Sequence, residues 1–161
     1  MCCCFRDLYD ASILHDIGKV GIPDDILLKP GPLTEEEWEL MKTHAEIGCK
    51  ALQRASKDLG ENSFLQMAMD VTLRHHEKWD GSGYPDGLKG LEIPLSARIV
   101  ALADVYDALT SVRPYKNAYS HEESVELIKK EAEKFDPEIL KIFLDNSAEF
   151  NRIRLEIKGK M

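Results

Sequence analysis

Residues 75–88 read HHEKWDGSGYPDGL, so two adjacent imidazoles stand directly before a glycine-rich loop. An earlier stretch, LHDIGK at residues 14–19, supplies an adjacent histidine and aspartate, and a further histidine and aspartate lie between and beyond the two stretches. Imidazoles combined with carboxylates suit Fe, Mn or Zn, whereas an all-oxygen set would suit Mg or Ca. The sequence therefore predicts a hydrolytic multi-metal site with six ligands, His15, Asp16, His44, His75, His76 and Asp104.

Length and composition limit the classes of protein that this chain can belong to. Its 161 residues predict a single domain over 1–161, with no receiver or sensory domain. The net charge of −8 argues against binding to DNA or RNA polymers, so a phosphate-bearing substrate would need local cations. The sequence has no apolar run of the roughly 20 residues that a membrane span requires, and no signal-peptide core. We therefore expect a cytoplasmic protein that does not enter the membrane.

The spacing of apolar residues predicts an all-α fold. Thr34 and Glu37 form a capping box, and Asp136-Pro137 is a typical helix start. Between the helices, residues 77–97 form a long loop rich in glycine, and such loops usually serve a function. The predicted helices cover residues 8–19, 34–52, 63–77, 96–111, 122–134 and 137–143.

The ligand types also predict a chemistry. A carboxylate such as Asp16 can bridge two metal ions, and a water between the ions becomes a nucleophile for in-line attack on phosphorus. On a helix, Lys19 lies three residues after Asp16 and therefore on the same face. Its ammonium would stabilise the charge that develops on a phosphodiester. Asp16 and Lys19 are therefore the predicted catalytic residues.

Each of these residues also has an ordinary structural interpretation. An isolated histidine in a helix is more often packed or exposed than a metal ligand, and this applies to His44 and, less strongly, to the pair at 75 and 76. Asp104 is more informative, because a carboxylate within an apolar run is costly unless it is paired or bound to metal. His121, next to two glutamates, is predicted to be a surface residue, and so are Lys29 and Lys42.

Three segments together resemble an HD-GYP domain, a subgroup of the HD-type metal phosphohydrolases that is associated with hydrolysis of bacterial cyclic di-GMP. They are residues 14–44, residues 75–116 and the short FDPEIL segment at 135–140, and with the helices between them they cover most of the chain. An HD dipeptide alone is a weak signal. An HD dipeptide followed in this order by the extended GYP motif is highly specific.

The resemblance implies a bundle of about five to seven helices that holds two or three divalent ions, with Fe or Mn favoured and Zn or Ni as alternatives. It assigns the six ligands named above, with Asp16 bridging. It also implies that Lys19, Arg113 and Lys116 contact the substrate phosphate. Gly83, Tyr84 and Pro85 form the signature turn, which would shape the rim of the substrate pocket or bind a signalling-protein partner.

One departure from the family pattern concerns the N-terminus. Relatives carry a further upstream helix that contributes a histidine, and often a glutamate, to the metal cluster. Here fourteen residues precede His15 and none of them is histidine. We therefore expect a domain that begins late and one metal position that is short of a ligand. The apolar surface left by the absent helix would favour a homodimer.

Three functions remain open on the sequence. The first is a phosphodiesterase that opens cyclic di-GMP, or a related cyclic dinucleotide, to the linear form. The second is a non-catalytic module that uses an impaired metal site to bind a nucleotide or a signalling protein. The third is an HD-type hydrolase that acts on a mononucleotide or another phosphate ester, which the extended GYP motif disfavours.

Overall fold

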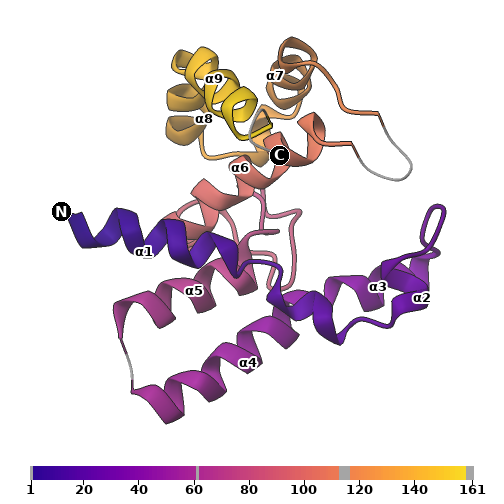
Figure 1. Cartoon of the computed structure of the whole chain (residues 1–161), viewed down its shortest axis with the longest axis vertical. Coiled ribbons are helices and arrows are strands. Elements are labelled where there is room, and N and C mark those ends of the chain that lie inside the picture. Colours follow the sequence, from indigo (N-terminus) through magenta and orange to yellow (C-terminus); the bar gives the residue numbers. More distant parts are fainter. Residues whose placement is uncertain (1, 61, 113–116, 159–161) are drawn as a thin grey trace.

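The computed structural model describes residues 2–60, 62–112 and 117–158, and all regular secondary structure in these ranges is helical. The predicted all-α fold is confirmed (Figure 1). The α-helices are α1 (Cys2–Ile13), α2 (Asp24–Leu27), α3 (Glu35–Lys42), α4 (His44–Leu59), α5 (Ser63–Arg74), α6 (Leu95–Thr110), α7 (His121–Lys130), α8 (Pro137–Asp145) and α9 (Ser147–Lys158). Three 3₁₀ helices complete the set, η1 (Ile17–Gly21), η2 (Gly90–Glu92) and η3 (Ala132–Lys134).

The first predicted helix, residues 8–19, ends earlier than expected. Helix α1 stops at Ile13, and the amides of Leu14 and Ile17 bond to carbonyls three residues back, Ala11 and Leu14, at 3.0 Å each. Bonds of this spacing make a tighter turn than an α-helix. The His-Asp motif therefore lies in a turn between α1 and η1, and the prediction of an α-helix through Lys19 is wrong.

The predicted helix at 34–52 is divided into α3 and α4. The capping box is present, since the amide of Glu37 donates to the hydroxyl of Thr34 (3.3 Å) and the amide of Thr34 donates to the carboxylate of Glu37 (2.7 Å). At Thr43 the hydroxyl donates to the carbonyl of Leu40 (2.6 Å), and α4 begins at the next residue. This division, together with α2 and α9, raises the predicted six helices to nine among the described residues.

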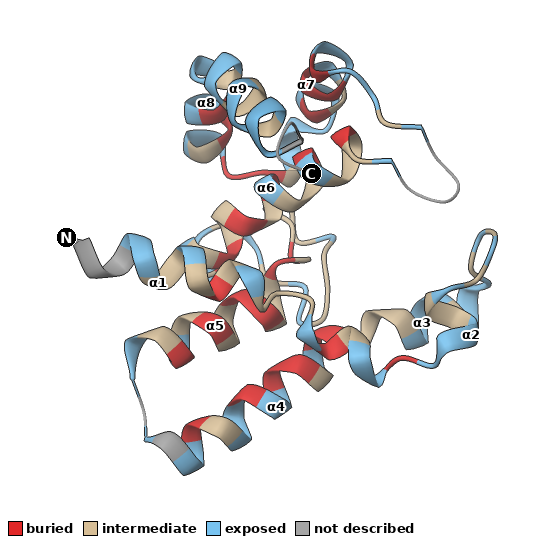
Figure 2. Ribbon diagram, in the orientation of Figure 1, coloured by how far each residue is buried: buried red, intermediate tan, exposed pale blue. Residues whose placement is uncertain are grey.

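Two apolar clusters hold the fold together, and α6 contributes to both. The first cluster lies between α1, α4, α5 and α6, and its buried members are Ala11, Leu52, Ala68, Val71 and Val100. The second joins α6 to α7 and α8, and its buried members are Leu102, Tyr106, Val125, Ile128, Phe135, Leu140 and Phe143. Figure 2 shows the buried residues on the sides of these helices that face one another. In the described ranges no helix has the length and apolar character that crossing a bilayer demands.

His121 corrects one sequence-based prediction. It is buried at 9% exposure rather than lying on the surface, and its Nδ1 is hydrogen-bonded to the hydroxyl of Tyr106 at 2.9 Å. The neighbouring Glu122 and Glu123 are exposed, because the side of α7 that carries His121 packs against α6. The two glutamates therefore correctly indicated an exposed face at the start of α7. They did not indicate that His121, the first residue of the helix, is buried on the other face.

Candidate metal centre

Three parts of the chain converge on one cluster of histidines around an aspartate. The turn after α1 contributes Asp16, the first residue of α4 is His44, and His75 and His76 follow the end of α5. One ligand atom from each of these four residues lies within 4.8 Å of all the others. His44 Nε2 is 3.3 Å and His75 Nε2 is 3.8 Å from the same oxygen, Oδ1 of Asp16.

The two remaining predicted ligands lie on the other side of Asp16. His15 Nε2 is 3.3 Å from Oδ2 of Asp16 and 3.8 Å from Oδ1 of Asp104, which comes from α6. All six predicted ligands are therefore in one place. Asp16 directs one oxygen toward His44 and His75 and the other toward His15, which is the arrangement that a carboxylate shared between two cations would need.

The histidine rings are oriented by backbone carbonyls. Nδ1 of His15 lies 2.6 Å from the carbonyl of residue 12, Nδ1 of His44 lies 2.8 Å from that of residue 41, and Nδ1 of His75 lies 3.0 Å from that of residue 71. Because a carbonyl only accepts, Nδ1 of each ring must carry a proton, and Nε2 of a ring that is neutral then keeps its lone pair. The Nε2 atoms of all three rings face Asp16.

The buried acceptors of the cluster fit a metal ion. Oδ1 of Asp16 and Nε2 of His44 and His75 are fully buried, and none has a hydrogen-bond partner among the described residues. Buried acceptors without partners are rare and costly in folded proteins, because they have lost their hydrogen bonds to water. Converging imidazole and carboxylate lone pairs would be satisfied by a divalent cation of the Fe, Mn or Zn kind.

Ionisation also favours cation binding. Burial lowers the pKa of His75 to about 4, and burial likewise lowers the pKa of His44 and, further still, of His76. Burial alone would raise the pKa of Asp16, but hydrogen bonds with His15 and Lys19 outweigh it and hold that pKa far below its usual range. At neutral pH His44, His75 and His76 therefore offer neutral imidazoles, and Asp16 offers a charged carboxylate.

Gly18 allows the segments to approach closely. A Cβ atom added at Gly18 would overlap the carbonyl oxygen of His44 and lie 2.5 Å from the amide nitrogen of Gly48. The absence of a side chain therefore lets η1 lie against the start of α4. The hydroxyl of Thr72 on α5 donates to the carbonyl of Leu14 at 3.1 Å, which ties a third segment to the same turn.

The glycine-rich loop folds back onto the histidine pair. The buried carboxylate of Glu77 accepts hydrogen bonds from the amides of Asp86 (2.7 Å) and Leu88 (3.0 Å). Gly83 packs so tightly that an added Cβ would lie 2.5 Å from Cα of Glu77 and 2.6 Å from the carbonyl oxygen of His76. Glu77 was not among the predicted site residues, although a carboxylate between two histidines and a loop was the available signal.

Tyr84 of the signature turn connects this loop to the cluster. Its ring is stacked on His76, with centroids 4.7 Å apart and planes 27° apart, and Trp38 of α3 meets it edge-on at 6.4 Å. The ammonium of Lys42 lies 5.7 Å from the same ring and also pairs with Glu39 at 2.7 Å, so Lys42 is not the simple solvated charge that we expected. Burial raises the pKa of Tyr84 well above its ordinary value.

The residues predicted to bind the substrate differ in where the structure places them. Lys19 lies on η1, and its ammonium donates to Oδ2 of Asp16 at 2.5 Å, so it stays beside the cluster although it is not on an α-helix. Gly83 and Pro85 are half-buried in the loop with Tyr84. Two further residues, Arg113 and Lys116, lie outside the described part of the chain.

A fold of helices that gathers a His-Asp pair and three further histidines around one carboxylate defines the class of HD domains. The family model described as "HD domain" matches residues 5–139, and the chain belongs to this family. It is 51% identical over 152 residues to a cyclic di-GMP phosphodiesterase of Vibrio cholerae, an alignment that covers 94% of this chain and 31% of that protein. It is 52% identical over 135 residues to a cyclic di-GMP phosphodiesterase of Thermotoga maritima, with 83% and 35% covered.

A third relative is named for a different nucleotide. The 3'3'-cGAMP-specific phosphodiesterase 2 of Vibrio cholerae is 44% identical over 149 residues, which are 92% of this chain and 28% of that protein. The chain spans about a third of the length of the curated relatives that it matches. The similarity therefore concerns one domain of larger proteins.

Proposed function

We propose that this domain is a metal-dependent phosphodiesterase that hydrolyses cyclic di-GMP, or a related cyclic dinucleotide, to the linear dinucleotide. The observation that carries the proposal is the position of Asp16 between two sets of histidines, together with buried acceptor atoms that have no hydrogen-bond partner among the described residues. The names of the relatives support the substrate class, since they include enzymes for cyclic di-GMP and for 3'3'-cGAMP.

The cluster would hold two or three divalent ions. Its mixture of imidazole and carboxylate ligands suits Fe, Mn or Zn, and the family resemblance favours Fe or Mn, with Zn or Ni as alternatives. Asp16 would be shared between ions. When bound, the ions supply Lewis acidity to the phosphoryl oxygens and acidify water for in-line attack. The proposed ligands are the six residues of the cluster, His15, Asp16, His44, His75, His76 and Asp104.

The chain's own residues would contribute positioning and charge. The carbonyl bonds to Nδ1 keep the rings of His15, His44 and His75 aimed at Asp16, so little reorganisation is needed when a cation binds. Lys19 holds its ammonium 2.5 Å from Asp16, where the negative charge of a reacting phosphate would increase. A cation fixed at that place stabilises the transition state more than the ground state.

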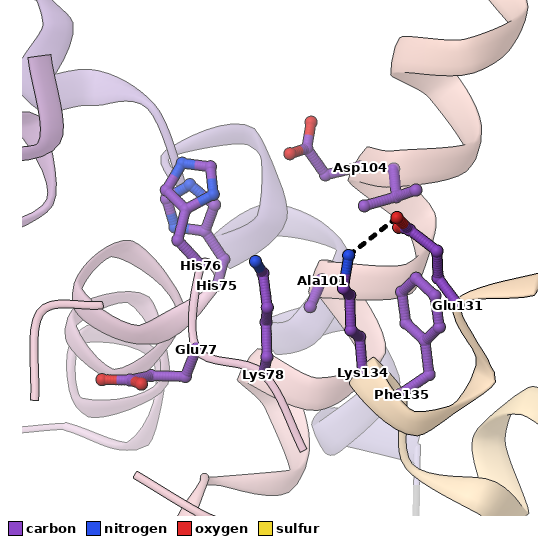
Figure 3. Close-up of a pocket in the computed structure, with 10 residues that line it drawn as sticks. His75, His76, Glu77, Lys78, Ala101, Asp104, Glu131, Lys134 and Phe135 are labelled. Carbon is purple, nitrogen blue, oxygen red and sulfur yellow. Dashed lines mark hydrogen bonds and ion pairs between the residues drawn. The ribbon is translucent and has the colours of Figure 1, made fainter. Parts of the chain in front are cut away.

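Arg113 and Lys116 would add further positive charge around the phosphate. Their assignment comes from the family motif, and it matches the need for local cations in a chain with a net charge of −8. A pocket beside the cluster is lined by His75, His76 and Asp104, and the phosphate of such a substrate would bind there (Figure 3).

A substrate panel tests this proposal. The chain is purified without oxygen, loaded with Fe or Mn, and incubated separately with cyclic di-GMP, 3'3'-cGAMP and a mononucleotide phosphate ester. The expected result is a linear dinucleotide from a cyclic dinucleotide, with no such product from an equally helical Asp16→Ala variant. Cleavage of the mononucleotide ester alone, or equal cleavage by the variant, would contradict the proposal.

A further inference from the structure

Lys78 lies in the pocket beside the metal cluster, and neither the motif analysis nor the reaction proposed above gives it a role. It is the second residue after the histidine pair, and it is half-buried. Figure 3 shows its side chain running into the pocket alongside the rings of His75 and His76, with the ammonium ending between those rings and Lys134. Asp104 lines the same pocket from α6.

The charges around the pocket distinguish Lys78 from the other lysines near the cluster. Lys134 donates to Glu131 at 2.7 Å, and Lys19 donates to Asp16 at 2.5 Å, so both have an acidic partner. Lys78 makes no ion pair and no side-chain hydrogen bond with any residue in ranges 2–60, 62–112 and 117–158. It therefore offers a positive charge that an incoming anion can pair with.

The backbone around Lys78 is held firmly. The amide of Gly81 donates to the carbonyl of Lys78 at 2.8 Å, and the amide of Trp79 donates to the carbonyl of Lys134 at 2.9 Å. The ring of Trp79 lies 5.7 Å from the guanidinium of Arg98. The start of this side chain is therefore fixed relative to the cluster, as a binding residue requires.

Lys78 is half-buried and its ammonium makes no ion pair with the described residues, so a charged hydrogen bond to an anion in the pocket would be favourable. A cyclic dinucleotide carries two phosphodiester groups, and hydrolysis to the linear form breaks only one of them. The second group keeps its negative charge and must lie near the first, because both belong to the same small ring. Lys78 and the ligands His76 and Asp104 line the same pocket.

We propose that Lys78 binds the second, uncleaved phosphodiester of the cyclic dinucleotide. This inference rests on the proposed function and deepens it, because it names a residue that distinguishes a cyclic dinucleotide from a substrate with a single phosphodiester. Lys78 would then contribute to substrate binding and not to breaking the P–O bond. Its removal should raise KM and leave kcat nearly unchanged.

The test compares two variants on two substrates. Lys78→Gln removes the proposed contact, and Lys134→Gln is the matched control, since it removes a lysine of the same pocket that is already paired with Glu131. The substrates are cyclic di-GMP and bis(4-nitrophenyl) phosphate, which has one phosphodiester. For Lys78→Gln we expect KM for cyclic di-GMP to rise roughly tenfold or more, the loss typical of a charged hydrogen bond. Its kcat, and both constants for the small diester, should stay within about twofold of wild type.

A binding measurement adds a readout that does not depend on turnover. Calorimetry of cyclic di-GMP on the metal-free chain should show a weaker dissociation constant for Lys78→Gln than for wild type or Lys134→Gln. Lys78→Arg should restore KM, because it keeps the charge.

The inference is overturned if wild type cleaves cyclic di-GMP and Lys78→Gln does so with an unchanged KM. It is also overturned if the variant loses activity equally on both substrates. If wild type cleaves only the small diester, this result would contradict the proposed function and therefore also the inference about Lys78.

Discussion

The ring of Tyr84 is stacked on the ring of His76, with centroids 4.7 Å apart and planes 27° apart. The signature turn of the glycine-rich loop is therefore in direct contact with a proposed metal ligand. His76 also meets His44 at 5.1 Å, so a displacement of Tyr84 would disturb both rings. In this fold the loop contacts the histidine cluster as well as bordering the pocket.

Removal of the Tyr84 ring should therefore weaken metal binding. For Tyr84→Ala we expect the affinity for Mn to fall about tenfold, which is the usual effect of losing a group that orients a ligand. Tyr84→Phe keeps the stacked ring and should stay close to wild type. Both variants can be titrated with Mn by calorimetry. An equal loss for Tyr84→Phe and Tyr84→Ala would mean that the hydroxyl, and not the stacking, supports the cluster.

Glu77 should control the conformation of the loop. Its buried carboxylate accepts from the amides of Asp86 and Leu88, and Glu77→Ala would leave both donors without a partner. We expect the free energy of unfolding in urea to fall by about 2–3 kcal/mol for Glu77→Ala. Glu77→Gln keeps one acceptor oxygen and should lose less. The free energy of unfolding should be lowest for Glu77→Ala, intermediate for Glu77→Gln and highest for wild type. Equal stability of all three proteins would refute this prediction.

Gly18 should be far less tolerant of a side chain than Gly21 on the same 3₁₀ helix. An added Cβ at Gly18 meets backbone atoms of His44 and Gly48, whereas at Gly21 it meets only the side chain of Ile47. Gly18→Ala should cost about 2–3 kcal/mol of stability, because packed backbone must move apart. Gly21→Ala should cost less than about 1 kcal/mol. Thermal unfolding of the two variants measures the difference, and similar melting temperatures would contradict the packing described here.

The metal-free protein should lose stability as the pH falls. The folded chain keeps His75 neutral down to a pKa of about 4, whereas the unfolded chain takes up this proton near 6.5. The unfolded state therefore binds more protons between these values, and stability rises with pH there. From pH 7 to pH 4 the free energy of unfolding should fall by on the order of 2–3 kcal/mol through His75 alone.

His15 acts in the opposite direction to His75. Its pKa is raised, chiefly by the hydrogen bond with Asp16, so its contribution is present below pH 6.5 and is lost as the pH rises through the folded pKa. Urea unfolding of His75→Gln separates the two effects. This variant should show a shallower loss between pH 7 and pH 4 than wild type. An unchanged slope would mean that His75 is not buried in its neutral form.

The sequence could predict which residues meet, but not how they meet. Ligand types and motif spacing predicted that His15, Asp16, His44 and Asp104 belong to one site, and the structure brings them together. The orientation of the rings depends on bonds to carbonyls three or four residues back, and these require the actual backbone path. The stacking of Tyr84 depends on how the loop folds back, which no local pattern reports.

The errors have physical causes of the same kind. Helical spacing at residues 8–19 continued past the point where bonds to carbonyls three residues back replaced those of the α-helix. The helical spacing of apolar residues at 34–52 also continued across Thr43, where the structure divides the predicted helix into α3 and α4. His121 stands beside two exposed glutamates, yet the packing of α7 on α6 buries it. The periodicity of apolar residues predicts which face of a helix is buried. The residue at which each helix ends depends on tertiary packing.

The central claim is that distant segments of this chain form one metal centre that acts on a cyclic dinucleotide. Elemental analysis of protein purified without oxygen, followed by a cyclic di-GMP cleavage assay on the same sample, tests it most directly. The account predicts at least two Fe or Mn ions per chain in wild type with formation of the linear dinucleotide, and loss of both ions and product in an equally helical Asp16→Ala variant. Wild type that retains no more metal than Asp16→Ala and leaves the dinucleotide intact would contradict it.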